Sequence, residues 1–282
     1  MENIKEREIM SRGLLDPKID FVFKNIFGSE DNPDLLISFL NATLKPINKI
    51  TYVKIKNGDI EKKYLDDKFS RLDIRATTSN GEIINIEIQL KNERNMIQRS
   101  LYYWSKLYEE QLGNGENYSK LKRTVCINIL NFKYLKTDNF HTAYRLKELK
   151  TNEELTDIQE IHFIEIPKLK DDSNEKDMLA TWVEFLKDPE SEKVRKLEFE
   201  INEIRKAKDQ LIKMSNDEKQ RYDYDMRMKT LRDEISALSS AREEASIEIA
   251  KNLLDILDDE TIASKTGLTS EFVKSLRQNK CE

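Results

Sequence analysis

Residues 71–90, RLDIRATTSNGEIINIEIQL, predict two β-strands joined by a tight turn. Successive side chains of a strand point to opposite faces, so each strand separates into an apolar and a polar face. The polar face of the second strand carries Asn85, Glu87 and Gln89. The polar face of the first strand carries Arg71, Asp73 and Arg75. This hairpin constrains the fold more than any other stretch of the chain.

The length of the turn decides which of these residues face each other. A two-residue loop at Asn80-Gly81 would pair Asp73 with Ile88 and place a carboxylate among apolar side chains. A three-residue loop, closed by Gly81 in the left-handed region, pairs Asp73 with Glu87 instead. A slip of one residue would move every side chain to the opposite face, so we predict the three-residue loop.

An Asp73–Glu87 pair predicts a metal site. Directly opposed residues have Cβ atoms roughly 4.5–5.5 Å apart, and two carboxylates that close repel unless a proton or a cation lies between them. Oxygen ligands of this kind suit Mg²⁺, with Mn²⁺ as a substitute, and substrate phosphate can complete the shell. Such a metal lowers the pKa of a bound water and neutralises charge on a phosphodiester. The alternative is an amphipathic hairpin whose polar face meets solvent.

The same residues resemble a known family. An Asp followed at a distance by Glu-X-Lys is the signature of the PD-(D/E)XK nuclease superfamily. The residues RLDI and NIEIQ resemble its recombination-promoting nuclease (Rpn) branch, also described as PD-(D/E)XK family transposases. The other segments that resemble this family are residues 16–28, 99–111, 120–132 and 230–245.

The resemblance implies a fold and an activity. The fold is an α/β restriction-endonuclease-like core, a mixed sheet flanked by helices, with an all-helical C-terminal region. The activity is Mg²⁺-dependent cleavage of double-stranded DNA, linked to recombination, mobile elements or phage defence. Asp73 and Glu87 would hold the metal together with the backbone carbonyl of Ile88. Asp20 is a further candidate ligand, although an i,i+4 ion pair with Lys24 is an alternative role for it.

Gln89 departs from the superfamily's lysine, although Gln is usual in this branch. An amide can orient the attacking water by hydrogen bonding but adds no positive charge. Lys91 lies one alternation further along the same face and is a candidate for the missing charge, or simply a solvated lysine at the strand end. Arg71 and Arg75, with Lys91, are candidate DNA contacts, and the alternative that the two arginines offset neighbouring acids stays open.

A competing hypothesis is a catalytically weak or inactive protein that binds nucleic acid or forms oligomers on the same scaffold. Gln89 and the net charge of −5 favour it, because phosphate contacts need Lys and Arg. The Asp73–Glu87 pair counts against it. A purely helical interaction scaffold would explain residues 190–250 but not the hairpin.

Composition narrows the class of protein. Charged residues make up 36% of the chain and only 7 positions are Gly, which predicts long solvated helices. No run approaches the ~18 apolar residues of a membrane span, and the start, MENIKEREIM, lacks the apolar segment of a signal peptide. We therefore expect a cytoplasmic protein with no membrane partner.

Cysteine and histidine usage argues against several kinds of site. Cys126 and Cys281 have no metal-ligand spacing, and Cys126 is expected to be a buried core thiol. His141 and His162 are the only histidines and are expected to lie far from any acidic pair. A histidine metal site or a Ser-His-Asp triad is therefore not predicted.

The chain divides into three predicted regions. They are a nuclease-like domain over 1–188, a long helical arm over 189–250 and a small helix-turn-helix-like tail over 251–282. The helices expected in the first region are 16–28, capped by Asp16 with Pro17 following, 33–44, 96–112 and 178–186. The strands expected outside the hairpin are 50–56, 60–65, 122–130 and 159–166.

The helical arm shows apolar residues at spacings of three and four. Ser215 to Glu218 has the sequence of a capping box, so we predict two helices with a break near residue 215. Lys208 and Arg242 interrupt the apolar seams. An arm that folds back on the core and a coiled-coil dimer therefore remain alternatives, and a homodimer or higher oligomer through the C-terminal helices is a candidate assembly.

The sequence of the tail predicts two helices joined by a turn. Gly267 is expected to end the first helix and Thr269 to begin the second, which carries Lys274, Arg277 and Lys280. Such a segment either reads DNA or forms a capping or oligomerising bundle.

Overall fold

The computed structural model describes residues 13–56, 74–171 and 177–279. They form two compact units, one that runs to Glu218 and one that begins at Lys219. In the part of the chain described, no helix has the length and apolar character needed to cross a membrane.

The first unit is built on a six-stranded mixed sheet with the order β1-β2-β3-β4-β6-β5. Its strands are β1 (Val53–Lys56), β2 (Ile74–Thr78), β3 (Ile83–Gln89), β4 (Thr124–Leu130), β5 (His141–Lys147) and β6 (Glu154–Glu165). β3, β4 and β6 run parallel to one another, while β1, β2 and β5 pair antiparallel with their neighbours. β3 and β4 are near-continuous apolar runs, as expected for strands that are covered on both faces.

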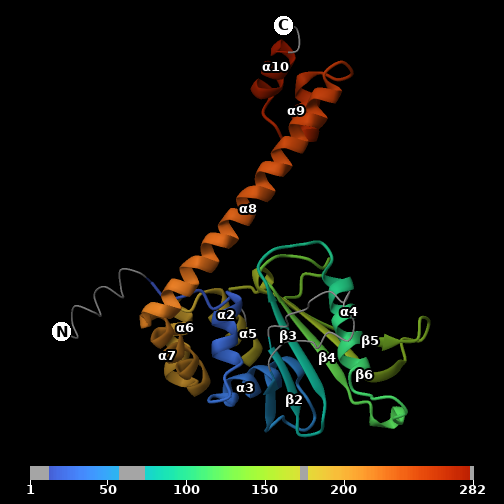
Figure 1. Cartoon of the computed structure of the whole chain (residues 1–282), viewed down its shortest axis with the longest axis vertical. Helices are drawn as coiled ribbons and strands as arrows, with labels where there is room; N and C mark the ends of the chain where they lie inside the picture. The colour runs from blue at the N-terminus through green and yellow to red at the C-terminus, as the bar shows by residue number, and fades with distance from the viewer. Residues whose placement is uncertain (1–12, 57–73, 172–176, 280–282) are drawn as a thin grey trace, which may run out of the picture. The chain divides into compact units, whose positions relative to one another are not determined.

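Helices cover both faces of this sheet. They are α2 (Asp20–Phe27), α3 (Pro33–Leu44), α4 (Met96–Glu109), α5 (Met178–Lys187), α6 (Glu192–Glu200) and α7 (Asn202–Asn216). Short 3-10 turns lie at Tyr118–Lys120 and Ile166–Lys168. Figure 1 shows α4 on one side of the sheet and α2, α3 and α5 on the other. The resulting α/β architecture, a mixed sheet flanked by helices with a helical C-terminal region, confirms the predicted fold class.

The core opposite α4 is aromatic. Phe27 of α2 lies at the centre of this cluster, with ring centroids 5.5 Å from Phe39 of α3 and 5.1 Å from Trp182 of α5. All three side chains are fully buried. Burying three large aromatic rings stabilises the layer that holds α2, α3 and α5 together. α7 joins this layer through the buried face of Ile204, Ala207, Leu211 and Met214, which follows helical spacing.

The boundaries of some elements differ from those expected. α3 matches the predicted range, but α2 begins at Asp20 rather than after Asp16. The Asp16 carboxylate accepts a hydrogen bond from the Lys18 amide at 2.9 Å, and its carbonyl accepts one from Ile19. Asp16 therefore closes a turn that precedes the helix. The strand predicted at 60–65 lies outside the described residues.

The arm predicted over 189–250 is divided between the two units. α6 and α7 pack on α2, α3 and α5 and belong to the first unit, so the expected boundary at 188/189 differs from the one at 218/219. The predicted helix break is confirmed at Asp217. Ser215 is not the N-cap that was expected, because it lies inside α7 and α8 begins only at Glu218. Its hydroxyl donates to the Leu211 carbonyl at 2.6 Å and accepts from the Leu15 amide at 3.0 Å.

The second unit consists of α8 (Glu218–Leu253), α9 (Asp259–Thr266) and α10 (Ser270–Asn279). The predicted turn is confirmed, since Gly267 ends α9 in the left-handed conformation with φ of 75°. α9 and α10 pack on the end of α8 through the buried residues Ala250, Leu254, Ile262, Ala263 and Val273. Arg277 donates to carbonyls at the end of α8 and pairs with Asp259 at 2.9 Å. Arg277 thus closes a small bundle rather than facing outward.

Candidate functional site

The hairpin that carries the candidate site has the predicted register. Ile74 pairs with Ile86 and Ala76 with Ile84. The Gly81 amide donates to the Thr78 carbonyl at 3.0 Å, and Gly81 has φ of 81°. This is the three-residue loop with a left-handed glycine, and it rules out the two-residue alternative. Arg71 and Asp73, the first two polar residues of the predicted pairing, lie outside the described residues.

The polar residues of β3 are buried. β3 lies between β2 and β4, and its side chains Asn85 and Glu87 are 2% and 1% exposed. α4 packs over this face of the sheet, so the face does not meet solvent as the amphipathic alternative required. A carboxylate is seldom this buried unless a cation or several hydrogen bonds compensate it.

Arg99 of α4 is the positively charged partner of Glu87. Its Nε lies 3.3 Å from Glu87 Oε2, its Nη1 lies 3.7 Å from Glu93 Oε2, and its Cζ lies 5.2 Å from the ring centroid of Tyr103. Burial alone would lower the pKa of Arg99, but the charge of Glu87 and the other acidic neighbours outweigh it and raise that pKa. A permanent cation therefore faces the buried carboxylate.

Asn85 provides a second oxygen beside Glu87. Its Nδ2 lies 3.5 Å from Glu87 Oε1, at the limit of a hydrogen bond. Its Oδ1 is buried and has no hydrogen-bond partner among the described residues. A buried amide oxygen without a partner is unusual and suits a bound cation or water.

A second pair of polar contacts fastens α4 to the sheet next to Glu87. Asn128 of β4 lies beside Glu87 in the parallel register, and its Oδ1 is 2.8 Å from the Ser100 hydroxyl. Asn128 Nδ2 donates to the His162 carbonyl at 3.0 Å. Further along α4, Trp104 Nε1 donates to the Thr124 carbonyl at 2.9 Å. These contacts fix the position of α4, and hence of Arg99, relative to β3.

Cys126 is the buried core thiol that the sequence predicted. It lies on β4 opposite Asn85. Burial, and to a smaller extent the charge of Glu87, raises the pKa of this thiol. Cys126 therefore stays protonated at neutral pH and takes no nucleophilic role.

Gln89, Ile88 and Lys91 lie at the end of β3. Gln89 is half-buried, and its backbone carbonyl accepts a hydrogen bond from the Asn131 amide at 2.9 Å. Ile88 is paired with Ile129 of β4. Lys91 is half-buried just beyond the strand. Asp20 lies on α2, which contacts α3 and α7. The roles of these four residues in a metal site stay predictions.

Several basic side chains are engaged within the protein, among them the candidate DNA contact Arg75. Arg75 Nη1 lies 2.8 Å from Glu110 Oε2 at the end of α4, and both side chains are largely buried. This is the arrangement in which Arg75 offsets a neighbouring acid. Lys18 donates to the Leu186 carbonyl at 3.0 Å, and Arg123 pairs with Glu160 at 2.8 Å.

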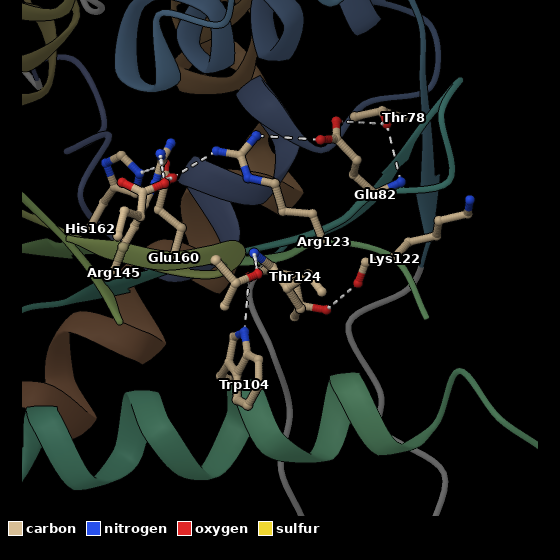
Figure 2. A network of polar contacts seen from close by, with 12 residues as sticks. Thr78, Glu82, Trp104, Lys122, Arg123, Thr124, Arg145, Glu160 and His162 are labelled. Carbon is tan, nitrogen blue, oxygen red and sulfur yellow. Dashed lines mark hydrogen bonds and ion pairs between the residues drawn. The ribbon is translucent and has the colours of Figure 1, made fainter. Parts of the chain in front are cut away.

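A second polar network lies on the opposite face of the sheet and was not predicted. Glu160 of β6 forms ion pairs with Arg123 and Arg145 and a hydrogen bond with His162 (Figure 2). Arg123 also reaches Glu82 at 3.3 Å, which ties the hairpin to β4 and β6. The histidines were expected to lie far from any acidic pair, and His162 instead has a single acid as its neighbour, with its Nε2 2.6 Å from Glu160 Oε1. Strand alternation over 159–166 would have placed the two side chains on one face.

His141 extends this network. Its Nε2 lies 2.9 Å from His162 Nδ1, and the two rings stack with centroids 5.2 Å apart. Burial, with smaller contributions from His162 and Lys45, lowers the pKa of His141 to about 4. Burial would raise the pKa of Glu160, but hydrogen bonds from His162 and Arg123 lower it to about 2. Each hydrogen bond of this network holds a charge or a ring in place, which fits a structural role.

The oxygen donors at the α4 face fit a hard cation in part. Glu87 and Asn85 supply a carboxylate and an amide oxygen, which are ligands that Mg²⁺ accepts. Across the described ranges, however, no three residues of the types His, Cys, Asp and Glu gather into a metal cluster. The described face therefore offers part of a coordination shell and would need a further acid or a ligand to complete it.

Comparison with known proteins identifies the family of the chain. The model of the PD-(D/E)XK nuclease family transposases matches residues 17–241, which includes the sheet, α4 and most of α8. No curated protein and no solved structure gives a match. Because the match spans most of the chain and contains the buried Glu87 of β3, the chain belongs to the PD-(D/E)XK nuclease family transposases.

Proposed function

We propose that this protein is a metal-dependent DNA endonuclease in which Asp73 and Glu87 hold the cation. The observation that carries the proposal is the buried Glu87 carboxylate on a central strand, in the register predicted from the sequence. Asp73 is the residue before the first described position of β2. Extending the register by one residue would place the two acids opposite each other, about 5 Å apart at Cβ.

The remaining ligands are proposed from β3 and α2. They are the carbonyl of Ile88 and, as a further candidate, the carboxylate of Asp20, with Asn85 Oδ1 close to Glu87. When bound, Mg²⁺ or Mn²⁺ would lower the pKa of a water and neutralise charge on the scissile phosphate. Gln89 would orient that water through its amide.

Arg99 is proposed to position Glu87. Its guanidinium offsets the charge of the buried carboxylate, and a carboxylate binds a metal in its charged form. The Nε–Oε2 distance of 3.3 Å is long for a charge-assisted hydrogen bond, which is usually about 2.8 Å. Glu87 can therefore exchange part of this contact for a bound cation without a large loss of interaction energy.

The proposed substrate is double-stranded DNA, and the proposed setting is recombination, mobile elements or phage defence. Membership of a nuclease family supports a nucleic acid as the substrate. Arg71 and Lys91 are the proposed phosphate contacts next to the site, and Arg75 would contribute only by leaving Glu110. With a net charge of −5, binding should depend on these local cations and weaken steeply with salt.

The decisive experiment incubates the purified chain with supercoiled plasmid in Mg²⁺, in Mn²⁺ and in chelator. We expect metal-dependent nicking that is lost in Asp73→Asn and in Glu87→Gln. The matched control is Asp209→Asn, an exposed acid on α7. Binding of Mn²⁺, followed by electron paramagnetic resonance, gives a readout besides activity. Cleavage that persists in both variants, with a contaminating nuclease excluded, would place the active site elsewhere.

A catalytically inactive DNA-binding protein is the second candidate. Gln89 at the lysine position and the engagement of Glu87 by Arg99 favour it. Fluorescence anisotropy with labelled duplex DNA in Ca²⁺ would separate the two. Binding without cleavage in either Mg²⁺ or Mn²⁺ supports the second candidate, and binding with nicking supports the first.

A further inference from the structure

α8 carries an apolar seam with the spacing of a coiled coil. Side chains at alternating intervals of three and four fall on one stripe of the helix from Tyr224 to Ile249. In heptad notation, position a holds Met228, Ile235, Arg242 and Ile249. Position d holds Tyr224, Leu231, Leu238 and Ala245. At 1.5 Å per residue the stripe is roughly 38 Å long and spans between three and four heptads, enough to sustain a coiled coil.

The seam is exposed within the second unit from Ile235 onward, and its earlier members Tyr224, Met228 and Leu231 are half-buried. Ile235, Leu238 and Ile249 are 50%, 65% and 52% exposed. α9 and α10 pack on a different side of α8, through Ala250 and Leu254. Ala250 follows Ile249 directly, and successive residues of a helix point about 100° apart, so the C-terminal bundle leaves the seam uncovered.

We propose that the seam of α8 pairs with the same seam of a second copy of this chain, in antiparallel orientation, with Ile235 against the partner's Leu238. A two-fold axis between the helices makes the two halves of the contact identical. Each Ile235 then meets a Leu238, so the most apolar part of the seam lies at the centre of the dimer. Burial of these exposed side chains supplies the driving force.

Charge decides the orientation. A parallel dimer stacks position a on position a, which would place Arg242 against the partner's Arg242 in the core. It would also bring Arg227, at position g, next to the partner's Arg232 at position e. Both contacts are between like charges and destabilise the parallel arrangement.

The antiparallel arrangement removes both conflicts. Position a now faces position d, so Arg242 lies against the partner's Leu231, with its guanidinium within about one turn of the partner's Glu234. Positions g face each other, so Arg227 lies opposite the partner's Glu248 at both ends of the contact. The two Arg227–Glu248 ion pairs of the antiparallel dimer replace the two Arg227–Arg232 contacts of the parallel one.

The first test measures the mass of the full-length chain by sedimentation over a range of concentrations. We expect a dimer that becomes a monomer in the double variant Ile235→Glu, Leu238→Glu. The matched control is Ser240→Glu, which adds a charge at position f, outside the seam, and should leave the dimer intact. Circular dichroism of each variant checks that the helix content is unchanged.

The second test is a charge exchange. Arg227→Glu and Glu248→Arg should each weaken the dimer about tenfold, because each replaces two attractive contacts with repulsive ones. The combined variant restores opposite charges and should regain most of the affinity.

The orientation is checked by disulfide formation in a Cys281→Ser background. A mixture of Ile235→Cys and Leu238→Cys chains should form a heterodimeric crosslink, and Leu238→Cys alone should crosslink poorly. Efficient crosslinking of Leu238→Cys to itself would indicate a parallel dimer and overturn the proposal. A wild-type chain that is monomeric at every concentration, or a dimer that survives both seam substitutions, would overturn it as well.

Discussion

Arg99 Nε and Glu87 Oε2 lie 3.3 Å apart, which joins the helix after the hairpin to the central strand of the sheet. Glu87 is 1% exposed, whereas the Arg99 side chain is 27% exposed. The Glu87 carboxylate is therefore the desolvated member of the pair. The charge of the Arg99 guanidinium offsets the energetic cost of that desolvation.

Removal of Arg99 should destabilise the first unit. Arg99→Ala leaves a buried carboxylate with less compensation, and we expect the free energy of unfolding to fall by about 1–3 kcal/mol. Glu87→Gln in the Arg99→Ala background should recover part of that loss, because the uncompensated charge is gone. Urea unfolding of the single and double variants measures both effects. Arg195→Ala, at an exposed arginine of α6, is the control and should change little. Equal stability of Arg99→Ala and wild type would contradict the importance of the pair.

Gly81 should be sensitive to substitution because of the turn that sets the register. Gly81 has φ of 81°, a conformation that costs other residues about 1 kcal/mol. Gly81→Ala should lower the free energy of unfolding by roughly that amount. Gly113→Ala is the matched control, since Gly113 has no positive φ and an added Cβ would meet its nearest atom at 3.6 Å. A neutral Gly81→Ala would argue against the left-handed turn.

The sequence predicted the hairpin well because the residues that determine its register lie close together in the chain. Alternation of apolar residues and a single glycine were sufficient to determine the register that pairs Ile74 with Ile86. The edge strand β5 was missed because most of its side chains are exposed, so the alternation that marks a half-buried strand is weak. Asp16 and Ser215 were misassigned as caps, because a local side-chain hydrogen bond can close a turn or bond back into a helix instead.

The partners of Glu87 could not be predicted in the same way. Arg99 and Asn128 reach the site from α4 and β4, and their approach depends on how the helix packs on the sheet. Alternation alone would have shown that Asn85 lies on the same face as Glu87. It could not show that this face is covered, because the apolar side of α4 that covers it is interrupted by polar residues such as Ser100.

Acid should destabilise the protein through the network around Glu160. The pKa of His141 is lowered from 6.5 to about 4, so between these pH values the unfolded chain binds a proton that the folded chain does not. The free energy of unfolding should therefore fall as the pH drops from 6.5 towards 4. Glu160, whose pKa is lowered from 4.5 to about 2, adds a further loss as the pH falls from 4.5 towards 2.

The contribution of His141 can be isolated by substitution. Urea unfolding at pH 7, 5.5 and 4.5 should show a shallower loss of stability for His141→Gln than for wild type, because Gln does not titrate. If both proteins lose the same free energy over this range, the acid sensitivity arises elsewhere in the chain.

The last prediction concerns Gln89, which is half-buried at the end of β3. Its amide can align a water but adds no positive charge, so Gln89→Ala should lower the cleavage rate without eliminating metal binding. Gln89→Glu should lower it further at neutral pH, because a third carboxylate near Asp73 and Glu87 repels the phosphate. Gln89→Lys restores the superfamily's usual residue and should preserve or raise the rate.

Cleavage rates and Mg²⁺ titrations of the three Gln89 variants test this order. The same three substitutions at Gln98, an exposed residue of α4, serve as matched controls and should leave the rate unchanged. Retained Mn²⁺ binding in Gln89→Ala would show that the loss of rate arises after the metal has bound. Indistinguishable rates for all three Gln89 variants would mean that this side chain takes no part in the chemistry. The positive charge next to Glu87 would then come from Arg99, the cation that the described structure places against that carboxylate.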